Sequence, residues 1–336
     1  MTTKSERLLA LLGVALLLGT LLAACGSTGS NTANSGNEQS IAGLQPVSLG
    51  PGEKLQAVAT TNIVGDVVRN VGGDRIALVT LMNTGVDPHT FVPTPSDTAA
   101  VHDAHVVFAN GAGLEAHLQE LLESAGGNAA EVHVSQGIEF LPPPGDAGQE
   151  PGSEDLDSHE EEDADPHVWF SVPNVIQWTR NIEHTLVALD PGNAGYYADN
   201  ARAYIGELEA LDAWIQEQVD TIPEAHRKLV TNHPVFGYFA DRYGLEQLGA
   251  VYPISPSSSP SAQEVAALQE TIQQYDVPAV FTEDTVNPRL AQQVANDTGI
   301  ELVPLYTGSL GGPGSGAESY VELMRYDVTA IVEALQ

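Results

Sequence analysis

Three of the ten histidines in this sequence lie in short proline-containing segments that could hold a metal ion. His89 lies in DPHTFVPTPSD, His167 in DPHVWF and His233 in TNHPVFGYF. Because proline restricts the backbone, each segment would fix the direction of its imidazole ring. Imidazole nitrogen suits Zn²⁺, whereas Mn²⁺ prefers more oxygen. The three histidines therefore predict a divalent metal site, with Zn²⁺ as the favoured ion and Mn²⁺ as the alternative.

The other histidines have weaker surroundings. His159 lies in an acidic stretch, where it could capture zinc weakly, although a solvated loop residue is the better interpretation. The rest lie on or beside predicted helical surface or outside any such segment, and we interpret most of them as surface groups: His102, His105, His117, His133, His184 and His226.

The elements around His89 predict an α/β lobe over residues 53–171. Residues 54–82 contain a β-rich run, a helical run that begins near Asn62, a Gly-Gly stop and a second β-rich run. AHVVFANG and then GLEAHLQELLESAGG repeat the order of strand and helix, which favours a mostly parallel sheet. Residues 141–165 interrupt this pattern with three consecutive prolines, followed by ten acidic residues between Asp146 and Asp165, and we expect a mobile surface loop there.

Residues 172–222 predict two linking helices, from Val172 to about Leu189 and from Ala194 to Thr221. The second would be about 40 Å long, enough to act as a spine between two lobes. The βα pattern resumes over residues 223–336 and ends in a helix from about Ser319. The expected fold class is α/β, with two α/β lobes joined by a long spine helix. Since the three histidines are 78 and 66 residues apart, the metal site should lie in the cleft between the lobes.

The charge of the chain argues against nucleic acid as a partner. The 336 residues include 45 acidic side chains against 12 Lys and Arg, for a formal net charge of −33. A protein that follows a phosphate backbone needs a basic surface, and this chain has no basic stripe. The negative charge favours solubility, and a field that gathers divalent cations is a second interpretation.

The first 25 residues resemble a bacterial lipoprotein signal. Lys4 and Arg7 precede an apolar run, and LAAC places small residues before Cys25, the single cysteine of the chain. We expect cleavage before Cys25 and attachment of lipid to it, which would anchor the protein to the outside of the bacterial cell membrane. Residues 26–52 follow as a flexible tether, since their first half is rich in Gly, Ser and Asn.

Several motifs in one order resemble the zinc and manganese solute-binding lipoproteins of bacterial ABC importers, the cluster A-I family. They are DPHTFVPTPSD, DPHVWFSVPN, HPVFGYFADRYGL, FTEDTVNPRLAQQVANDTG and LYTGSLGGPGSGAESY, and they cover nearly all of residues 53–336. The resemblance implies that His89, His167 and His233 bind the metal between the lobes. It also implies an ABC permease with a cytoplasmic ATPase as the partner, and we expect a monomer that is not an enzyme.

The sequence departs from this family at the fourth metal ligand. The family commonly supplies a carboxylate in a D-S-L or D-P-L segment, whereas Gly308 stands at that place in LYTGSLGG. Glu283 in FTED matches a family acid near the cleft. It could bind the metal directly, or it could orient a ligand histidine. Water is the third possibility for the fourth position.

Two other classes of function use similar features. Three histidines and a water also describe a catalytic zinc site, but the sequence has no H-E-x-x-H helix and no clear general base beyond Glu283. A zinc hydrolase is therefore the weaker interpretation. An adhesin of the same fold is the other alternative.

Overall fold

Two four-stranded parallel sheets form the framework of the protein in a computed structural model that describes residues 43–119, 121, 125–142, 164–252 and 260–336. The first sheet has the strand order β2-β1-β3-β4, and the second has the equivalent order β6-β5-β7-β8. Every strand pair within them is parallel. The prediction of two α/β lobes is confirmed, and we call the halves that contain these sheets the N-lobe and the C-lobe.

The N-lobe follows the predicted strand-helix-strand order. Helix α1 begins at Asn62, where the Thr61 side chain accepts a hydrogen bond from Val64 N, and it ends at Gly72 before Gly73, which has a φ of 52°. Glycine tolerates this positive φ without the steric cost of a Cβ. The elements of this lobe are β1 (Leu55–Ala59), α1 (Asn62–Gly72), β2 (Ile76–Thr80), α2 (Pro95–Asp103), β3 (Val106–Ala109) and β4 (Ala130–His133). The helix expected after residue 112 falls partly outside the described residues.

The C-lobe repeats this arrangement. Its terminal helix α9 begins with a capping box, in which the Ser319 side chain accepts from Glu322 N and the Glu322 side chain accepts from Ser319 N. The elements are β5 (Lys228–Thr231), α6 (Gly237–Tyr243), β6 (Glu246–Ala250), α7 (Ala262–Tyr275), β7 (Ala279–Glu283), α8 (Arg289–Thr298), β8 (Glu301–Leu305) and α9 (Tyr320–Leu335).

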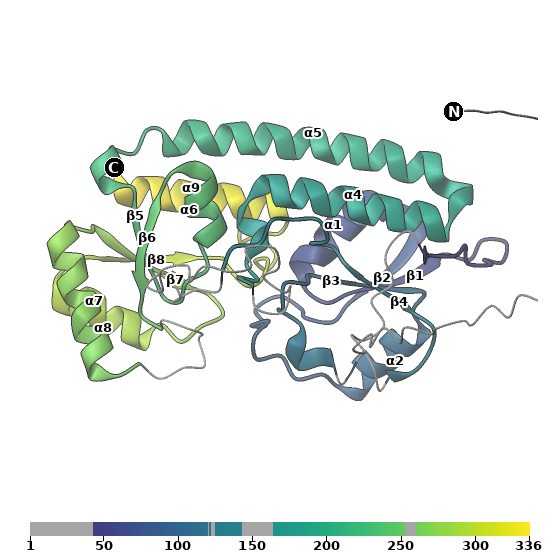
Figure 1. The fold of residues 1–336 in the computed structure, drawn as a ribbon, viewed down its shortest axis with the longest axis horizontal. Coiled ribbons are helices and arrows are strands. Elements are labelled where there is room, and N and C mark those ends of the chain that lie inside the picture. The colour runs from purple at the N-terminus through teal and green to yellow at the C-terminus, as the bar shows by residue number, and fades with distance from the viewer. Residues whose placement is uncertain (1–42, 120, 122–124, 143–163, 253–259) are drawn as a thin grey trace, which may run out of the picture. The chain divides into compact units, whose positions relative to one another are not determined.

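Two long helices connect the lobes, as predicted. They are α4 (Val172–Leu189) and α5 (Ala194–Val219). Helix α5 packs on α4 and α1 and also on α9 and α6, so it contacts both lobes (Figure 1). Short 3-10 turns complete the described helices: Gly73–Arg75, Ala116–Leu118, Val168–Phe170, Pro191–Asn193 and Glu224–His226.

One continuous hydrophobic core runs beneath α5 through both lobes. It includes Val67 of α1, Leu186 of α4, Leu211 of α5, Phe281 of β7 and Val328 of α9, all of which are 1% exposed or less. The opposite face of each sheet packs on a smaller cluster of its own, around α2 in the N-lobe and around α7 and α8 in the C-lobe. The lobes therefore share one core along their α5 side, which opposes a wide opening between them.

The end of the predicted tether differs from expectation. Residues 26–52 were predicted to be flexible, yet Leu44 is 8% exposed within the shared core, and Val47 N donates to Leu189 O over 2.8 Å. The apolar residues in this stretch explain the difference, because they gain from burial at the end of α4. The signal segment and Cys25 lie outside the described residues. Among the described helices, none combines the length and the apolar character that a membrane span requires.

Candidate metal centre

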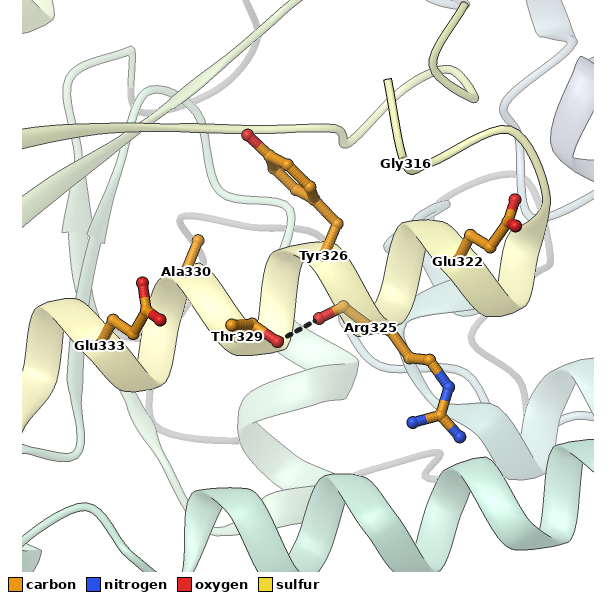
Figure 2. Close-up of a pocket in the computed structure, with 7 residues that line it drawn as sticks. All are labelled: Gly316, Glu322, Arg325, Tyr326, Thr329, Ala330 and Glu333. Atoms are coloured by element: carbon orange, nitrogen blue, oxygen red, sulfur yellow. Dashed lines mark hydrogen bonds between the residues drawn. The ribbon is translucent and has the colours of Figure 1, made fainter. Parts of the chain in front are cut away.

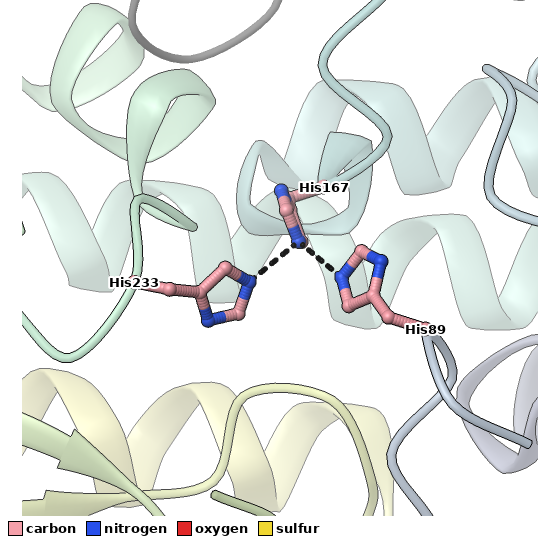
Figure 3. A group of neighbouring side chains, drawn as sticks. All are labelled: His89, His167 and His233. Atoms are coloured by element: carbon pink, nitrogen blue, oxygen red, sulfur yellow. Dashed lines mark hydrogen bonds between the residues drawn. The ribbon is translucent and has the colours of Figure 1, made fainter. Parts of the chain in front are cut away.

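The imidazole rings of His89, His167 and His233 point toward one another (Figure 3). His167 Nε2 lies 3.1 Å from His89 Nε2 and 3.3 Å from His233 Nε2. Within the described ranges, this is the group of three potential metal-ligating side chains whose donor atoms all lie within 4.8 Å of one another. The structure thus brings together the three histidines that the sequence singled out.

The carboxyl ends of the parallel strands position two of these rings. His89 follows β2 and His233 follows β5, and carboxyl ends of parallel strands are where open α/β sheets place their ligand sites. His167 reaches the same place from the entry to α4, where it immediately precedes the short 3-10 turn Val168–Phe170. Two loops of the N-lobe and one loop of the C-lobe therefore carry the three rings.

A buried carboxylate determines the tautomer of His167. Asp165 Oδ1 lies 2.7 Å from His167 Nδ1 and also accepts from His167 N over 3.0 Å. Both side chains are 4% exposed. Because an ionised carboxylate only accepts hydrogen bonds, Nδ1 carries the proton and Nε2 keeps its lone pair.

Glu283 has the same relation to His233. Glu283 Oε1 lies 2.5 Å from His233 Nδ1, and Glu283 Oε2 accepts from Thr307 Oγ1 over 2.7 Å. Glu283 comes from the end of β7 and is 5% exposed. The side chain therefore contacts the outer nitrogen of the ring, and His233 Nε2 is left with its lone pair facing the centre.

The close approach of His167 Nε2 and His233 Nε2 favours a cation between them. When both rings are neutral and carry their proton at Nδ1, the Nε2 lone pairs of His167 and His233 meet at 3.3 Å, and this contact is a hydrogen bond only when one ring carries a second proton. A cation between them removes the repulsion. Zn–N distances of 2.0–2.1 Å place neighbouring nitrogens of a tetrahedral site about 3.3 Å apart, which matches the observed separations.

The site is largely closed to solvent. His167 and His233 are each 3% exposed, while His89 is only half-buried. Trp169 covers one side, since its ring centroid lies 5.4 Å from that of His167 and its Nε1 donates to Thr307 O. His89 is therefore the most exposed of the three histidines.

Loop residues 307–310 of the C-lobe are bound to the N-lobe. Asn62 Nδ2 donates to Ser309 Oγ, and Asn62 Oδ1 accepts from Leu310 N, both over 3.0 Å. Gly85 N also donates to Ser309 Oγ over 2.8 Å. Gly308, which lies between these anchored residues, lines the same small pocket as the three histidines.

A further bond ties α1 to the start of α9. Asp66 Oδ2 accepts from Tyr320 N over 3.0 Å. Burial raises the pKa of Asp66, although the hydrogen bond from Tyr320 N opposes that rise. The two lobes are thus joined by polar contacts beside the site as well as by the shared core.

Sequence reasoning missed the role of Asp165. The residue was assigned to the acidic surface loop 141–165, but it is 3% exposed and bound to His167. The available signal was the repeated triplet Asp-Pro-His, which occurs at both Asp87 and Asp165. Residues 143–163 of that predicted loop, including His159, lie outside the described residues.

The interpretation of the other histidines holds only in part. His102 and His184 are exposed, as expected. His105 is half-buried, and its Nδ1 accepts from Gln56 N over 2.9 Å. His226 is also half-buried, with its Nδ1 3.1 Å from Leu335 O. These rings bind backbone groups, which a sequence without a recognisable motif does not reveal.

A second hollow lies on the outer surface of α9 (Figure 2). Glu322, Arg325 and Glu333 line it, and Arg325 also lies 4.6 Å from the ring of Trp214. These charged side chains are exposed and of mixed sign. The hollow therefore lacks the convergent, buried donors of the histidine site.

Comparison with known proteins gives one protein family for this chain. The family model described as "Zinc-uptake complex component A periplasmic" matches residues 57–334. The manganese-binding lipoprotein MntA of Halalkalibacterium halodurans is 35% identical over 285 residues, which cover 84% of this chain and 89% of that protein.

Solved structures share the fold. The periplasmic zinc-binding protein TroA from Treponema pallidum matches with a TM-score of 0.74 and 28% identity, over 84% of this chain and 99% of TroA. A manganese-bound periplasmic metal-binding protein from Candidatus Liberibacter asiaticus matches with a TM-score of 0.73 and 26% identity, over 84% of this chain and all of that one. Proteins described with either metal thus have this architecture.

Proposed function

This chain belongs to the family of periplasmic zinc-uptake component A, the substrate-binding proteins of metal ABC importers, and we propose that the ion it captures and delivers is zinc. His89, His167 and His233 are the proposed ligands. The protein works outside the cytoplasmic membrane, and the proposed partner is a membrane permease driven by a cytoplasmic ATPase.

One observation carries the proposal of these ligands. The Nε2 atoms of His167 and His233 lie 3.3 Å apart, while Asp165 and Glu283 contact the outer nitrogens of the same rings. Such carboxylate–histidine pairs orient metal ligands in proteins and raise their basicity. The two carboxylates also carry two negative charges. These charges offset the two positive charges of a divalent ion bound to the opposite nitrogens of the rings.

The donor set supports zinc over manganese. Three imidazole nitrogens at tetrahedral spacing suit Zn²⁺, while Mn²⁺ favours carboxylate, carbonyl and water oxygens. The curated relative from Halalkalibacterium halodurans is named for manganese, which keeps manganese as the second candidate. The absence of a carboxylate at Gly308 is the feature of this chain that favours zinc.

Binding strength alone does not separate the two metals, because sites of this kind bind Zn²⁺ more tightly than Mn²⁺ in general. The decisive experiment is therefore cellular. Deletion of the gene should lower the zinc content of metal-starved cells and leave manganese unchanged, and added zinc should restore growth. A loss of manganese with unchanged zinc would identify manganese as the cargo.

The geometry supports binding rather than hydrolysis. A zinc hydrolase needs a general base that reaches the metal-bound water. Both oxygens of Glu283 are engaged, one with His233 and the other with Thr307. Asp165 likewise holds the outer nitrogen of His167. We therefore expect a protein that carries the ion without chemical change to a substrate.

We also propose Cys25 as the lipid anchor of the protein. The LAAC segment places it at the cleavage point of a lipoprotein signal, and relatives such as MntA are named lipoproteins. Cys25→Ala should give an uncleaved precursor without lipid. Labelling with a radioactive fatty acid would test this, and normal labelling of the variant would contradict the proposal.

A further inference from the structure

Two backbone carbonyls directly before His167 each accept a hydrogen bond from a buried side chain. Tyr238 Oη donates to Asp165 O, and Asn110 Nδ2 donates to Pro166 O, both over 3.0 Å. Tyr238 and Asn110 are 4% and 0% exposed. Tyr238 belongs to α6 of the C-lobe, whereas Asn110 directly follows β3 of the N-lobe. Side chains of both lobes therefore hold the segment that carries His167.

The segment depends on these side chains because no strand pairing holds it. Residues 165–167 lie in neither sheet, and Pro166 has no N–H to donate. Asp165 N donates to Leu141 O over 2.9 Å, and Leu141 N donates to Tyr238 Oη over 3.0 Å. The Tyr238 hydroxyl thus donates to Asp165 O and accepts from Leu141 N, so its hydrogen-bonding orientation is fixed.

The residue before Tyr238 packs on the carboxylate of Asp165. A Cβ built on Gly237 would lie 2.7 Å from Asp165 Oδ2 and 3.7 Å from Leu141 Cδ1. Gly237 is not among the glycines with positive φ, so close approach is the reason that glycine suits this position. Oδ1 of the same carboxylate contacts His167 Nδ1. A side chain at residue 237 would therefore displace the group that determines the tautomer of His167.

Aromatic packing holds the start of α6 against the same segment. The ring centroids of Phe236 and Phe170 lie 4.5 Å apart, and both side chains are 1% exposed or less. Phe170 comes three residues after His167, and Phe236 comes three residues after His233. The chain segments that carry these two histidines are thus packed on each other beside the rings.

We propose that Tyr238 and Gly237 are positioning residues for His167. They hold the backbone and the carboxylate of Asp165, and Asp165 orients the His167 ring. This inference rests on the proposed function, because it concerns the zinc affinity of the three-histidine site. It makes the ring direction of an N-lobe histidine depend on a helix of the C-lobe. Asn110 still holds Pro166 O when the Tyr238 hydroxyl is absent, so its loss should loosen the ring without releasing it.

Tyr238→Phe tests the hydroxyl, since it keeps the aromatic ring. Zinc binding, measured by competition with a zinc-sensitive dye, should weaken by about two- to tenfold, the equivalent of one net hydrogen bond. Nitrogen NMR of the metal-free full chain in detergent, at about pH 8 where histidine rings are neutral, reports the tautomers. His167 should be the Nδ1–H tautomer in the unchanged protein and a mixture of both in Tyr238→Phe. The spectrum of His167→Ala identifies the signal.

Tyr197→Phe is the matched control for this variant. Tyr197 is 0% exposed, and its hydroxyl donates to Asp190 at the end of α4, so the change also removes a buried hydroxyl. It should alter neither zinc affinity nor the His167 tautomer. Weaker zinc binding by Tyr238→Phe with an unchanged tautomer would overturn the positioning role of the hydroxyl, and so would unchanged zinc binding.

Gly237→Ala tests the packing on the carboxylate. Its Cβ should push Asp165 away from His167 Nδ1 and weaken zinc binding by about ten- to a hundredfold, as loss of an outer partner does. Gly206→Ala is the control, because Gly206 also lies in a helix and a Cβ there meets nothing within 4 Å. Equal zinc binding by the two folded alanine variants would remove Gly237 from the proposal. Tyr238→Phe decides the proposal if Gly237→Ala does not fold.

The tautomer measurement needs no metal, so this inference and the proposed function fail separately. If zinc binds and His167→Ala abolishes binding, the three-histidine site stands whatever the NMR shows. If His167→Ala binds zinc as well as the unchanged protein, the proposed metal site is wrong, and the NMR still tests whether Tyr238 holds the His167 ring.

Discussion

The triplet Asp-Pro-His occurs twice, at Asp87-Pro88-His89 and at Asp165-Pro166-His167, and the two copies use their aspartates differently. In each copy the aspartate Oδ1 accepts from the histidine N, over 2.9 Å in the first and 3.0 Å in the second. Only Asp165 also contacts its histidine ring, at Nδ1. The second oxygen of Asp87 instead accepts from Thr90 Oγ1.

The environments of the two triplets explain this difference. Asp165 and His167 are buried under Trp169, where a charged group needs a partner, whereas His89 is half-buried and Thr90 is exposed. The same three residues therefore produce the same backbone bond in both copies. The partner of the ring depends on the surrounding fold, so the triplet alone does not reveal which aspartate tunes a ligand.

Among changes in the two triplets, removal of a histidine ring should weaken zinc binding most. His167→Ala deletes a buried proposed ligand and should weaken zinc binding at least about a hundredfold, more than the loss of an outer partner usually does. His184→Ala, an exposed change in α4, should bind zinc normally. Competition with a zinc-sensitive dye measures both. Near-normal zinc binding by folded His167→Ala would remove His167 from the site.

Substitution of Asp165 should weaken zinc binding more than substitution of Asp87, although the two aspartates lie in the same triplet. Asp165→Asn removes the charge behind His167 and should weaken zinc binding by about ten- to a hundredfold. Asp87→Asn leaves an oxygen that can still accept from His89 N, so the loss should be about fivefold or less, the equivalent of one modest hydrogen bond. Isothermal titration of both variants measures the contrast. Equal losses would show that the backbone bond, and not the ring contact, determines affinity.

Acidification should also weaken zinc binding, and it tests the protonation states on which the comparison depends. Protons compete with the ion for Nε2, so zinc affinity should fall as pH drops from neutral to about pH 5, by up to about tenfold per pH unit for each ligand that must lose a proton. Competition titrations at several pH values measure the slope. A flat profile would contradict histidine ligation.

Much of the fold was predictable because the central strands are rich in β-formers and because glycine follows the last residue of α1, α6 and α8. Runs such as LQAVA and AVFTE gave β1 and β7, and Gly73 marked the end of α1. Strands β4 and β6 were missed, since AEVH and EQLGA are short edge strands with few β-branched residues. Their pairing comes from the neighbouring strands, which a local pattern does not contain.

The candidate site was predictable at its three histidines and less so around them. Proline-containing motifs marked His89, His167 and His233. The contacts that give the rings their chemistry join distant residues: Glu283 is 50 residues from His233, and Pro88 meets Gly308. Such contacts depend on how the lobes pack. The resemblance to a family located Glu283 and Gly308, and the structure then provided the atoms that they touch.

The shared core beneath α5 has a consequence for how this protein denatures. Many two-lobed proteins melt in two steps because each lobe has its own core. Here the apolar residues of α1, α4, β7 and α9 form one cluster, so neither lobe can unfold without exposing the surface of the other. Heat should therefore give a single cooperative transition. An ion at a hundred times its Kd would add about 2.7 kcal/mol to the whole molecule, which makes the melting temperature a reading of metal occupancy.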